Sequence, residues 1–278
     1  MPPAFSADSV VQFGYSLHSM KSLLTLLLAI FTVSALAEDA PKPIHALMVC
    51  GGCCHDYENQ KRILSEGISK RANVEWTIVQ EGTDREHRVS IYEKPDWAKG
   101  YDVVLHNECF GFVKDDKFVE GIARPHFEGL PAVVLHCSTH SYREATTDEW
   151  RQLIGQTSHS HEKAADLTVK NIDPEHPVMK GFPMEWNDPA DELYKNEKLW
   201  PNFIPLGKAY GVQTKMDHAC IWVNTYGKGK VFGTTLGHSN ATMESDVYLD
   251  LVTRGLLWAC DKLDANGKPK PGYGPGGK

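Results

Sequence analysis

Apolar residues recur along the chain in short blocks that alternate between strand-like and helix-like spacing. The continuous apolar run Ile44–Cys50 is typical of a strand that is buried on both faces of a parallel sheet. Helical spacing over Glu58–Lys70 follows it. The same pattern predicts further strands at Val74–Val79, Tyr101–His106 and Ala132–Cys137, and helices at Asp115–Phe127 and Asp148–Ile154. This alternation predicts an α/β fold, with a mainly parallel sheet covered by helices on both faces.

The pattern changes in the second half of the chain. Few helical segments separate the next strand-like runs, which are Leu167–Val169, Ile204–Ala209, Cys220–Asn224 and Val231–Thr235. We expect these runs to form an antiparallel extension or edge of the sheet. A long helix over Met243–Cys260 then closes the domain. Residues 264–278 are rich in Gly, Pro and Lys, which predicts a disordered tail.

A leader precedes the first strand. Lys21 stands before the apolar run Leu23–Val33, and a small-x-small site, Ala35-Leu36-Ala37, follows. This order is typical of a secretory signal peptide. The run has about 11 residues, too few to cross a bilayer core of ~30 Å. We therefore expect a leader over residues 1–37, with a signal peptide at 20–37 that is cleaved after Ala37. The protein would be secreted or periplasmic, with no membrane contact after cleavage.

The composition narrows the function classes. The formal net charge of −7 argues against a nucleic-acid-binding protein, because neutralising phosphates requires a basic surface. About 240 residues remain after cleavage, which suits one α/β domain with a full core. The sequence is compatible with a homo-oligomer. The chain carries 13 histidines, a high count that draws attention to where they lie.

The seven cysteines are an odd number, so at least one thiol is unpaired within the chain. Export permits disulfides, yet several cysteines lie in apolar strand patterns, where a free thiol behaves as a small hydrophobic side chain. We expect mostly free thiols, with at most one bridge among the 50–54 cluster and its neighbours. The spacing Cys50-x-x-Cys53 permits redox chemistry, but no thioredoxin-like unit surrounds it.

Polar residues follow three of the predicted parallel strands. In open parallel sheets, ligands bind beyond the carboxyl ends of the strands. The residues at these three ends are His55, Asp56 and Tyr57, then Glu108, then His136, His140, Tyr142 and Arg143. A single strand-end histidine is more often a packing residue, but several ionisable groups at three ends favour a site.

Further candidates lie downstream. His159 and His161 are two positions apart, so in an extended segment both can reach one metal ion, together with His140; an exposed polar loop explains them equally well. The pair Asp191 and Glu192 can hold sugar hydroxyls or can cap turns. The remaining candidates are His238, which follows a strand, and Trp222, which lies inside one. Gly227-Lys228-Gly229-Lys230 predicts a hairpin turn and lacks the spacing of a phosphate-binding loop.

These segments together resemble the ThuA-like (trehalose utilisation) family over about Ile44 to Cys260. The motifs that carry the resemblance are Gly51-Gly52 with His55-Asp56-Tyr57, Tyr101-Asp102-Val103-Val104, the strand end at His136, His176-Pro177-Val178, Asp191-Glu192-Leu193-Tyr194, Gly227-Lys228-Gly229-Lys230-Val231, Leu236-Gly237-His238 and Leu257-Trp258-Ala259. The resemblance implies a single ThuA-like domain over residues 38–263. It also implies a flavodoxin-like, class I glutamine amidotransferase-like three-layer sandwich.

The resemblance also bears on Cys137. Amidotransferases carry their nucleophilic cysteine in a Gly-x-Cys-x-Gly elbow, whereas Leu135 and Thr139 flank Cys137 here. The ThuA-like pattern has a histidine at the strand end, and His136 matches it. A Cys-dependent amidotransferase-like hydrolase is therefore the least favoured alternative.

The resemblance implies an exported enzyme of carbohydrate catabolism that acts on a sugar or keto-sugar by isomerisation, elimination or hydrolysis. A keto group acidifies the neighbouring C–H bonds, so the reaction needs a base and a group that stabilises an enediolate. Glu108, His55 or His136 is the candidate base. His140, Arg143 or a divalent metal, Zn²⁺ or Mn²⁺, is the candidate carbonyl-polarising group.

The other candidates are expected to bind the substrate, which would be a small carbohydrate: Asp56, Tyr57, Tyr142, Arg143, Asp191, Glu192, Trp222 and His238. Two alternatives remain. One is a carbohydrate-binding protein of the same fold without turnover. The other is a structural metal site, which would have four protein ligands and no open position.

Overall fold

The computed structural model describes residue 14 and residues 42–277. The segment 20–37, for which a signal peptide is predicted, lies outside the described residues. Within residues 42–277, no helix combines the length and the apolar character needed to cross a membrane.

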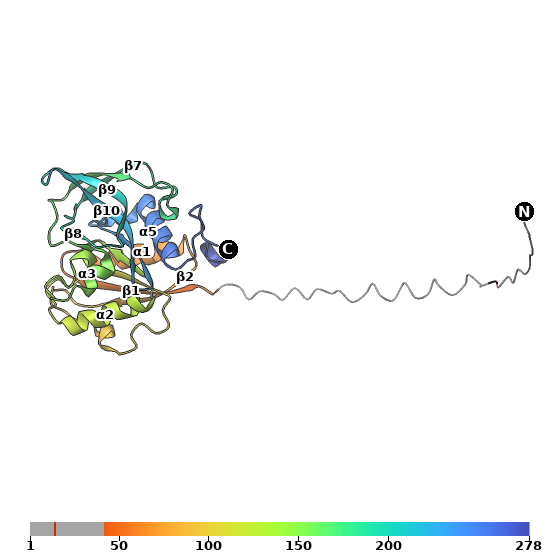
Figure 1. Ribbon diagram of the computed structural model, residues 1–278, viewed down its shortest axis with the longest axis horizontal. Helices are drawn as coiled ribbons and strands as arrows, with labels where there is room; N and C mark the ends of the chain where they lie inside the picture. The colour runs from red at the N-terminus through yellow and green to blue at the C-terminus, as the bar shows by residue number, and fades with distance from the viewer. Residues whose placement is uncertain (1–13, 15–41, 278) are drawn as a thin grey trace, which may run out of the picture. The chain divides into compact units, whose positions relative to one another are not determined.

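One nine-stranded sheet runs through the domain (Figure 1). Its strands, in spatial order, are β2 (Val74–Gln80), β1 (Ile44–Gly52), β3 (Val103–Cys109), β4 (Ala132–Leu135), β11 (Gly229–Thr234), β10 (Met216–Tyr226), β9 (Ile204–Gly211), β6 (Ala165–Asn171) and β7 (Glu185–Asp191). The first five strands are parallel, and the last four continue the sheet antiparallel. β5 (Gln156–Thr157) and β8 (Lys198–Leu199) form a separate small sheet.

Helices cover both faces of the parallel part. The helices α1 (Tyr57–Ser69) and α5 (Asp246–Ala259) pack on one face, and α2 (Asp116–Glu128) and α3 (Glu149–Ile154) pack on the other. Alternate residues of β1 enter the two cores: Met48 packs with α1 and α5, whereas Leu47 packs with α2 and α3. This double burial explains the continuous apolar run of β1. The predicted three-layer α/β sandwich is confirmed.

The carboxyl-terminal half differs from the prediction in two elements. We expected the run Val231–Thr235 in the antiparallel extension, but β11 pairs parallel with β4 and antiparallel with β10. It is a buried fifth parallel strand because the hairpin from β10 returns it to the centre of the sheet. The predicted helix Met243–Cys260 is broken at Ser245, whose extended backbone (φ −62°, ψ 132°) ends α4 (Asn240–Glu244) before α5 begins.

The predicted disorder of the tail is also corrected over residues 264–277. The backbone N–H of Asn73 donates to the carbonyl of Tyr273 at 3.0 Å, and the Asn73 side chain donates to the carbonyl of Gly272 at 3.1 Å. Tyr273 packs against the core that α1 and α5 share. Composition indicated flexibility, but one aromatic anchor and these backbone bonds hold the segment against the domain.

Candidate functional site

Three imidazoles meet where β1, β4 and β11 end. His55 lies in the turn after β1, His136 directly follows β4, and His238 lies just beyond β11. The ring centroids are 4.7 Å apart for His55 and His136, 5.2 Å for His55 and His238, and 5.5 Å for His136 and His238. The sequence predicts each of these residues at a strand end, and the structure brings all three together.

The backbone turns sharply at His136. Its φ of 41° lies in the left-handed region, which costs a non-glycine residue about 1–2 kcal/mol. The side chain is 1% exposed, and Nδ1 donates a hydrogen bond to the carbonyl of Thr235 at 2.6 Å. This bond and the surrounding packing hold the imidazole at the inner end of the site, with Nε2 facing Glu192.

Glu192 is the carboxylate at the centre of this cluster. It follows β7, the edge strand, and its side chain is 14% exposed. One oxygen lies 3.5 Å from His136 Nε2 and 3.5 Å from His161 Nε2, and the other lies 3.5 Å from His238 Nδ1. Burial opposes ionisation of Glu192, but its close contact with the His136 imidazole and with the other imidazoles outweighs burial and lowers its pKa.

The histidines around Glu192 differ in protonation. Burial lowers the pKa of His55 to about 3, and the neighbouring imidazoles of His136 and His238 add to this effect. Burial also lowers the pKa of His140 to about 2, with the guanidinium of Arg143 contributing. Burial opposes protonation of His136 too, but Glu192 and the other acceptors around it outweigh burial and raise its pKa.

A cavity of about 410 Å³ opens in front of these groups, at the carboxyl end of the parallel strands. It is lined by Cys53, Cys54, His55, Arg85, Cys109, Gly111, Cys137, His140, Arg143, His159, Ser160, His161, Glu192, Tyr194 and His238. A second cavity, of about 570 Å³, lies at the opposite end of the sheet beside Ile44 and Pro131. Ligands of parallel sheets bind at the carboxyl end, so the smaller cavity is the candidate site.

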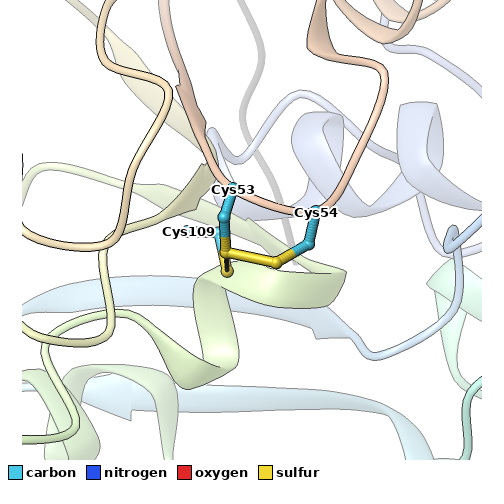
Figure 2. Close-up of side chains that lie close together, drawn as sticks. All are labelled: Cys53, Cys54 and Cys109. Atoms are coloured by element: carbon cyan, nitrogen blue, oxygen red, sulfur yellow. Dashed lines mark hydrogen bonds between the residues drawn. A yellow bond between two sulfur atoms is a disulfide. The ribbon is translucent and has the colours of Figure 1, made fainter.

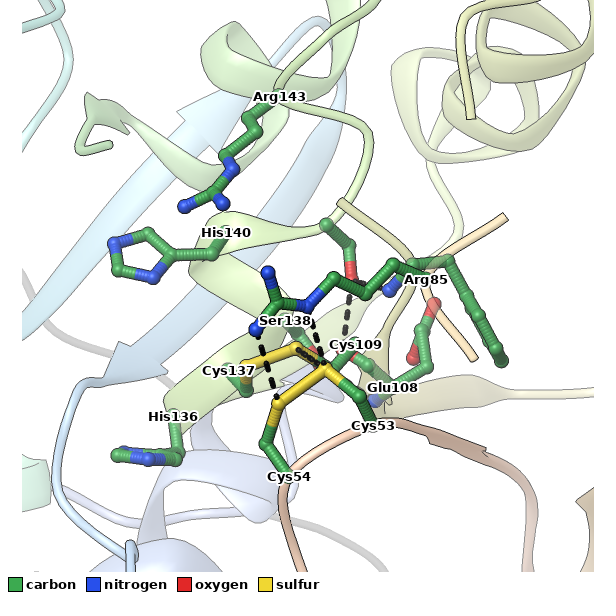
Figure 3. Close-up of a disulfide and its surroundings, with 12 residues drawn as sticks. Cys53, Cys54, Arg85, Glu108, Cys109, His136, Cys137, Ser138, His140 and Arg143 are labelled. Atoms are coloured by element: carbon green, nitrogen blue, oxygen red, sulfur yellow. Dashed lines mark hydrogen bonds between the residues drawn. A yellow bond between two sulfur atoms is a disulfide. The ribbon is translucent and has the colours of Figure 1, made fainter. Parts of the chain in front are cut away.

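Four cysteines form one wall of this pocket. Cys53 is bonded to Cys54 (Figure 2), and Cys109 at the end of β3 is bonded to Cys137 (Figure 3). The sulfurs of Cys53 and Cys109 lie 3.8 Å apart without a bond. Arg85 donates to the sulfurs of Cys53 at 3.2 Å and Cys54 at 3.7 Å, as the dashed lines in Figure 3 show.

The expectation of mostly free thiols is therefore wrong. Four of the seven cysteines form two disulfides, one between the adjacent Cys53 and Cys54 and one between Cys109 and Cys137, which two strand ends bring together. Cys50, Cys220 and Cys260 stay free. No bond joins Cys50 to Cys53, since Cys50 lies inside β1, where burial raises the pKa of its thiol to about 12. Cys137 is bonded to Cys109, so it presents no thiolate to a substrate.

The profile of one protein family matches most of the chain. This profile is that of ThuA, described as trehalose utilisation, and it matches residues 46–259. The chain belongs to the ThuA family. Its membership indicates a carbohydrate-related role. A search of curated proteins finds none that matches the chain in sequence.

Solved structures show the same fold. A ThuA-like protein from Parabacteroides merdae is 19% identical, with a TM-score of 0.64 over 82% of this chain and 92% of that one. A ThuA-like protein from Bacteroides uniformis is 14% identical, with a TM-score of 0.60 over 83% of this chain and 96% of that one. The domain of this ThuA-family chain therefore has the fold that these proteins share.

Three predicted site residues lie below the pocket, in the core. Glu108 is fully buried and accepts hydrogen bonds from Tyr92 at 3.2 Å and from the His106 ring at 2.9 Å, so it does not reach the cavity as a base. Tyr142 is buried with its ring edge-on to Trp150. Trp222 is fully buried and donates to the carbonyl of Ile154 at 2.7 Å. Glu108 lies near the end of β3, Trp222 lies within β10 and Tyr142 follows β4, and all three side chains are buried in the core.

Asp56, Tyr57 and Asp191 shape the site without lining the pocket. Asp56 caps α1 through the backbone N–H of Asn59. The hydroxyl of Tyr57 donates to the carbonyl of Cys53 at 3.1 Å. Asp191 accepts from the backbone N–H of Gly237 at 2.7 Å and so positions the loop that carries His238. The sequence predicted that these residues bind the substrate, and in the structure their side chains form hydrogen bonds with backbone groups around the site.

The metal candidates His140, His159 and His161 line the pocket but do not form a ligand group among the described residues. His159 bonds to Glu197 at 2.7 Å, and His140 bonds to Ser158 at 3.0 Å. The rings of His140 and His161 stack with centroids 6.0 Å apart. The loop folds so that only His161 contacts Glu192. Arg143 lines the cavity and donates to the carbonyl of His159 at 3.0 Å.

Tyr194 and Arg85 are functional side chains of the pocket that the sequence did not single out. Tyr194 stacks on His140 with centroids 4.0 Å apart, and its hydroxyl lies 3.5 Å from His136 Nε2. It stands two positions after Glu192 in the motif that carried the resemblance, so a signal was present. Arg85 lies in a long loop after β2 with no motif around it, and the sequence offered no signal for it.

Proposed function

We propose that this ThuA-family protein is an exported enzyme of carbohydrate catabolism that acts on a keto-sugar. The observation that carries the proposal is the position of Glu192, which lies at a pocket wall within 3.5 Å of three imidazoles. A carboxylate and imidazoles in contact can take up, pass on and return a proton. The pocket volume lies within the range typical of small-molecule sites.

The chemistry follows from the substrate class that the family suggests. A keto group acidifies the C–H bond beside it, and Glu192 takes that proton to leave an enediolate. Returning the proton at the neighbouring carbon isomerises the sugar, and loss of a substituent from the next carbon is elimination. Glycosidic bonds can be broken in this way, with water added afterwards. Arg143, a cation at the same pocket, stabilises the negative oxygen.

Cationic and ionisable side chains outnumber aromatic faces at this pocket. Tyr194 is the aromatic residue that lines it, and Trp222 is in the core. Recognition of a sugar without turnover relies on exposed aromatic platforms and amides, so the composition of this wall favours catalysis over binding alone.

The test is product formation from oxidised sugars. The mature protein is incubated with keto-derivatives of disaccharides and glycosides, and products are followed by NMR spectroscopy. We expect turnover that falls at least about 100-fold in Glu192→Gln, which keeps the shape of the side chain but removes its charge. Glu185→Gln, which changes an exposed carboxylate at the start of β7, the strand that Glu192 follows, is the matched control and should retain activity. Binding of sugars with no turnover of any would contradict the proposal and leave a carbohydrate-binding protein.

A further inference from the structure

Three nitrogens at the inner end of the pocket are arranged as ligands. His55, His136 and His238 each offer one ring nitrogen, and these atoms all lie within 4.8 Å of one another. In a tetrahedral site with metal–nitrogen bonds of ~2.1 Å, ligand nitrogens lie about 3.4 Å apart, so side-chain adjustments of about an ångström close the site. We propose that His55, His136 and His238 bind one divalent transition-metal ion, of the class of Zn²⁺ or Mn²⁺.

Two of the three nitrogens need a partner. His55 Nδ1 and His238 Nδ1 are buried, and among the described residues neither has a hydrogen bond. The contact of His238 Nδ1 with Glu192, at 3.5 Å, is too long to satisfy it. Buried polar atoms without partners are uncommon in folded proteins and costly. One ion between the rings satisfies both nitrogens at once.

The third ligand is held in the orientation that metal-binding histidines adopt. His136 donates Nδ1–H to the carbonyl of Thr235 at 2.6 Å, so Nε2 is the nitrogen left for the ion. A histidine that binds a metal commonly donates its other ring N–H to a carbonyl or carboxylate, which fixes the ring. The strained backbone at His136, with φ of 41°, points this ring into the cluster.

Glu192 supplies negative charge at the same point. Its two oxygens lie 3.5 Å from His136 Nε2 and 3.5 Å from His238 Nδ1. A carboxylate so close offsets the charge of a buried dication. His55 and His238 also line the pocket, so an ion between them faces the cavity. Three protein ligands leave a position open for a substrate oxygen. That the ion polarises the keto group of a sugar rests on the proposed function; the binding site itself does not.

A sulfur cluster nearby is the competing site. Cys53, Cys54 and Cys109 also place ligand atoms within 4.8 Å of one another. Metals bind the thiolate form of cysteine, whereas these sulfurs are in disulfides. In the oxidised protein the histidine cluster is therefore the site that binds.

The experiment uses the oxidised protein made metal-free by chelation, and it titrates Zn²⁺, Mn²⁺ and Co²⁺ separately. Bound metal is counted by elemental analysis after dialysis, and Co²⁺ absorption reports the ligand type. We expect one ion per chain, with a cobalt spectrum that has no thiolate charge-transfer band. His55→Ala and His238→Ala should each weaken binding at least about tenfold. His45→Ala, an exposed histidine on β1, is the control and should bind as the wild type does.

Circular dichroism checks that each variant is folded. If an alanine variant does not fold, His55→Asn or His238→Asn replaces it. Lack of binding of all three ions, unchanged binding in the histidine variants, or a thiolate band overturns the proposal. Turnover is measured separately. Metal binding without keto-sugar turnover leaves the metal site standing and removes the proposed function. Turnover that depends on Glu192, in a protein that binds none of the three ions, removes the metal site and leaves the proposed function standing.

Discussion

The Nδ1 atom of His136 lies 2.6 Å from the carbonyl oxygen of Thr235, and this bond joins the end of β4 to the end of β11. Because a carbonyl oxygen can only accept, Nδ1 carries a hydrogen and Nε2 is the nitrogen that faces Glu192. One backbone contact thus decides which side of the imidazole faces the pocket chemistry.

The left-handed backbone at His136 gives a prediction about stability. Its φ of 41° suits glycine better than any residue with a Cβ atom. We expect His136→Gly to be more stable than His136→Ala, with a free energy of unfolding about 1 kcal/mol larger, although glycine normally destabilises a folded protein. Urea unfolding of the two variants measures the difference. An alanine variant more stable than the glycine variant would show that the strain is absent.

The two disulfides should differ in their contribution to stability. The bond between Cys109 and Cys137 spans 28 residues, so removing it by the double substitution to alanine should lower the free energy of unfolding by about 3–4 kcal/mol. The bond between Cys53 and Cys54 joins neighbours and closes almost no loop, so Cys53→Ala with Cys54→Ala should cost much less. Equal losses in chemical denaturation would count against this account.

The same disulfides predict a thiol count. Denatured protein without reductant should expose three reactive thiols, Cys50, Cys220 and Cys260, and reduction should raise the count to all seven cysteines. Seven thiols before reduction in the freshly purified protein would contradict the pairing.

A buried histidine that does not line the pocket should make stability depend on pH. Burial lowers the pKa of His126 to about 3, and the nearby His106 contributes. An unfolded histidine titrates near 6.5, so between about pH 6.5 and 3 the unfolded chain binds a proton that the folded chain does not. Stability is then fully present above pH 6.5 and falls by about 1.4 kcal/mol per pH unit below it for this group.

His126→Asn tests this dependence. Asparagine cannot titrate, so the slope of unfolding free energy between pH 6.5 and 5 should become shallower by about one proton, even if overall stability drops. Urea unfolding over a pH series provides the slope, with His45→Asn, an exposed histidine, as the control. A slope equal to that of the wild type would refute the assignment.

The core position of Trp222 leads to a different expectation from its predicted sugar contact. It is fully buried and donates to the carbonyl of Ile154. We expect Trp222→Phe to lower stability because the indole N–H bond and volume are lost, and to leave the KM for a keto-sugar unchanged. Steady-state kinetics with unfolding curves separates the two. A raised KM with unchanged stability would restore a direct sugar contact.

The hydrophobic periodicity of the sequence was enough to predict the three-layer α/β sandwich. The double-buried β1 and the amphipathic α1 have clear spacing, and the rule that parallel strand ends meet at one edge located His55 and His136. Periodicity could not show that Ser245 interrupts a helix, since the break depends on one extended residue. It also could not show that β11 lies beside β4, because strand order depends on where the chain returns.

The side-chain contacts of the site could not be predicted from the sequence for a similar reason. Glu108 and Tyr142 stand at strand ends like His55, but the direction in which each side chain points decides whether it meets the pocket or the core. Glu192 was a candidate for holding sugar, and only the fold shows that it lies among His136, His161 and His238. The disulfide between Cys109 and Cys137 likewise joins two strand ends that are adjacent only in space.

In the proposed reaction, Glu192 removes the proton beside a sugar keto group. Exchange of that C–H hydrogen for deuterium in D₂O measures this step directly, and NMR follows it on a 3-keto-disaccharide with the wild type, Glu192→Gln and Glu185→Gln. We expect exchange with the wild type and Glu185→Gln, and exchange at least about 100-fold slower with Glu192→Gln. Equal exchange in Glu192→Gln and the wild type would contradict this reaction.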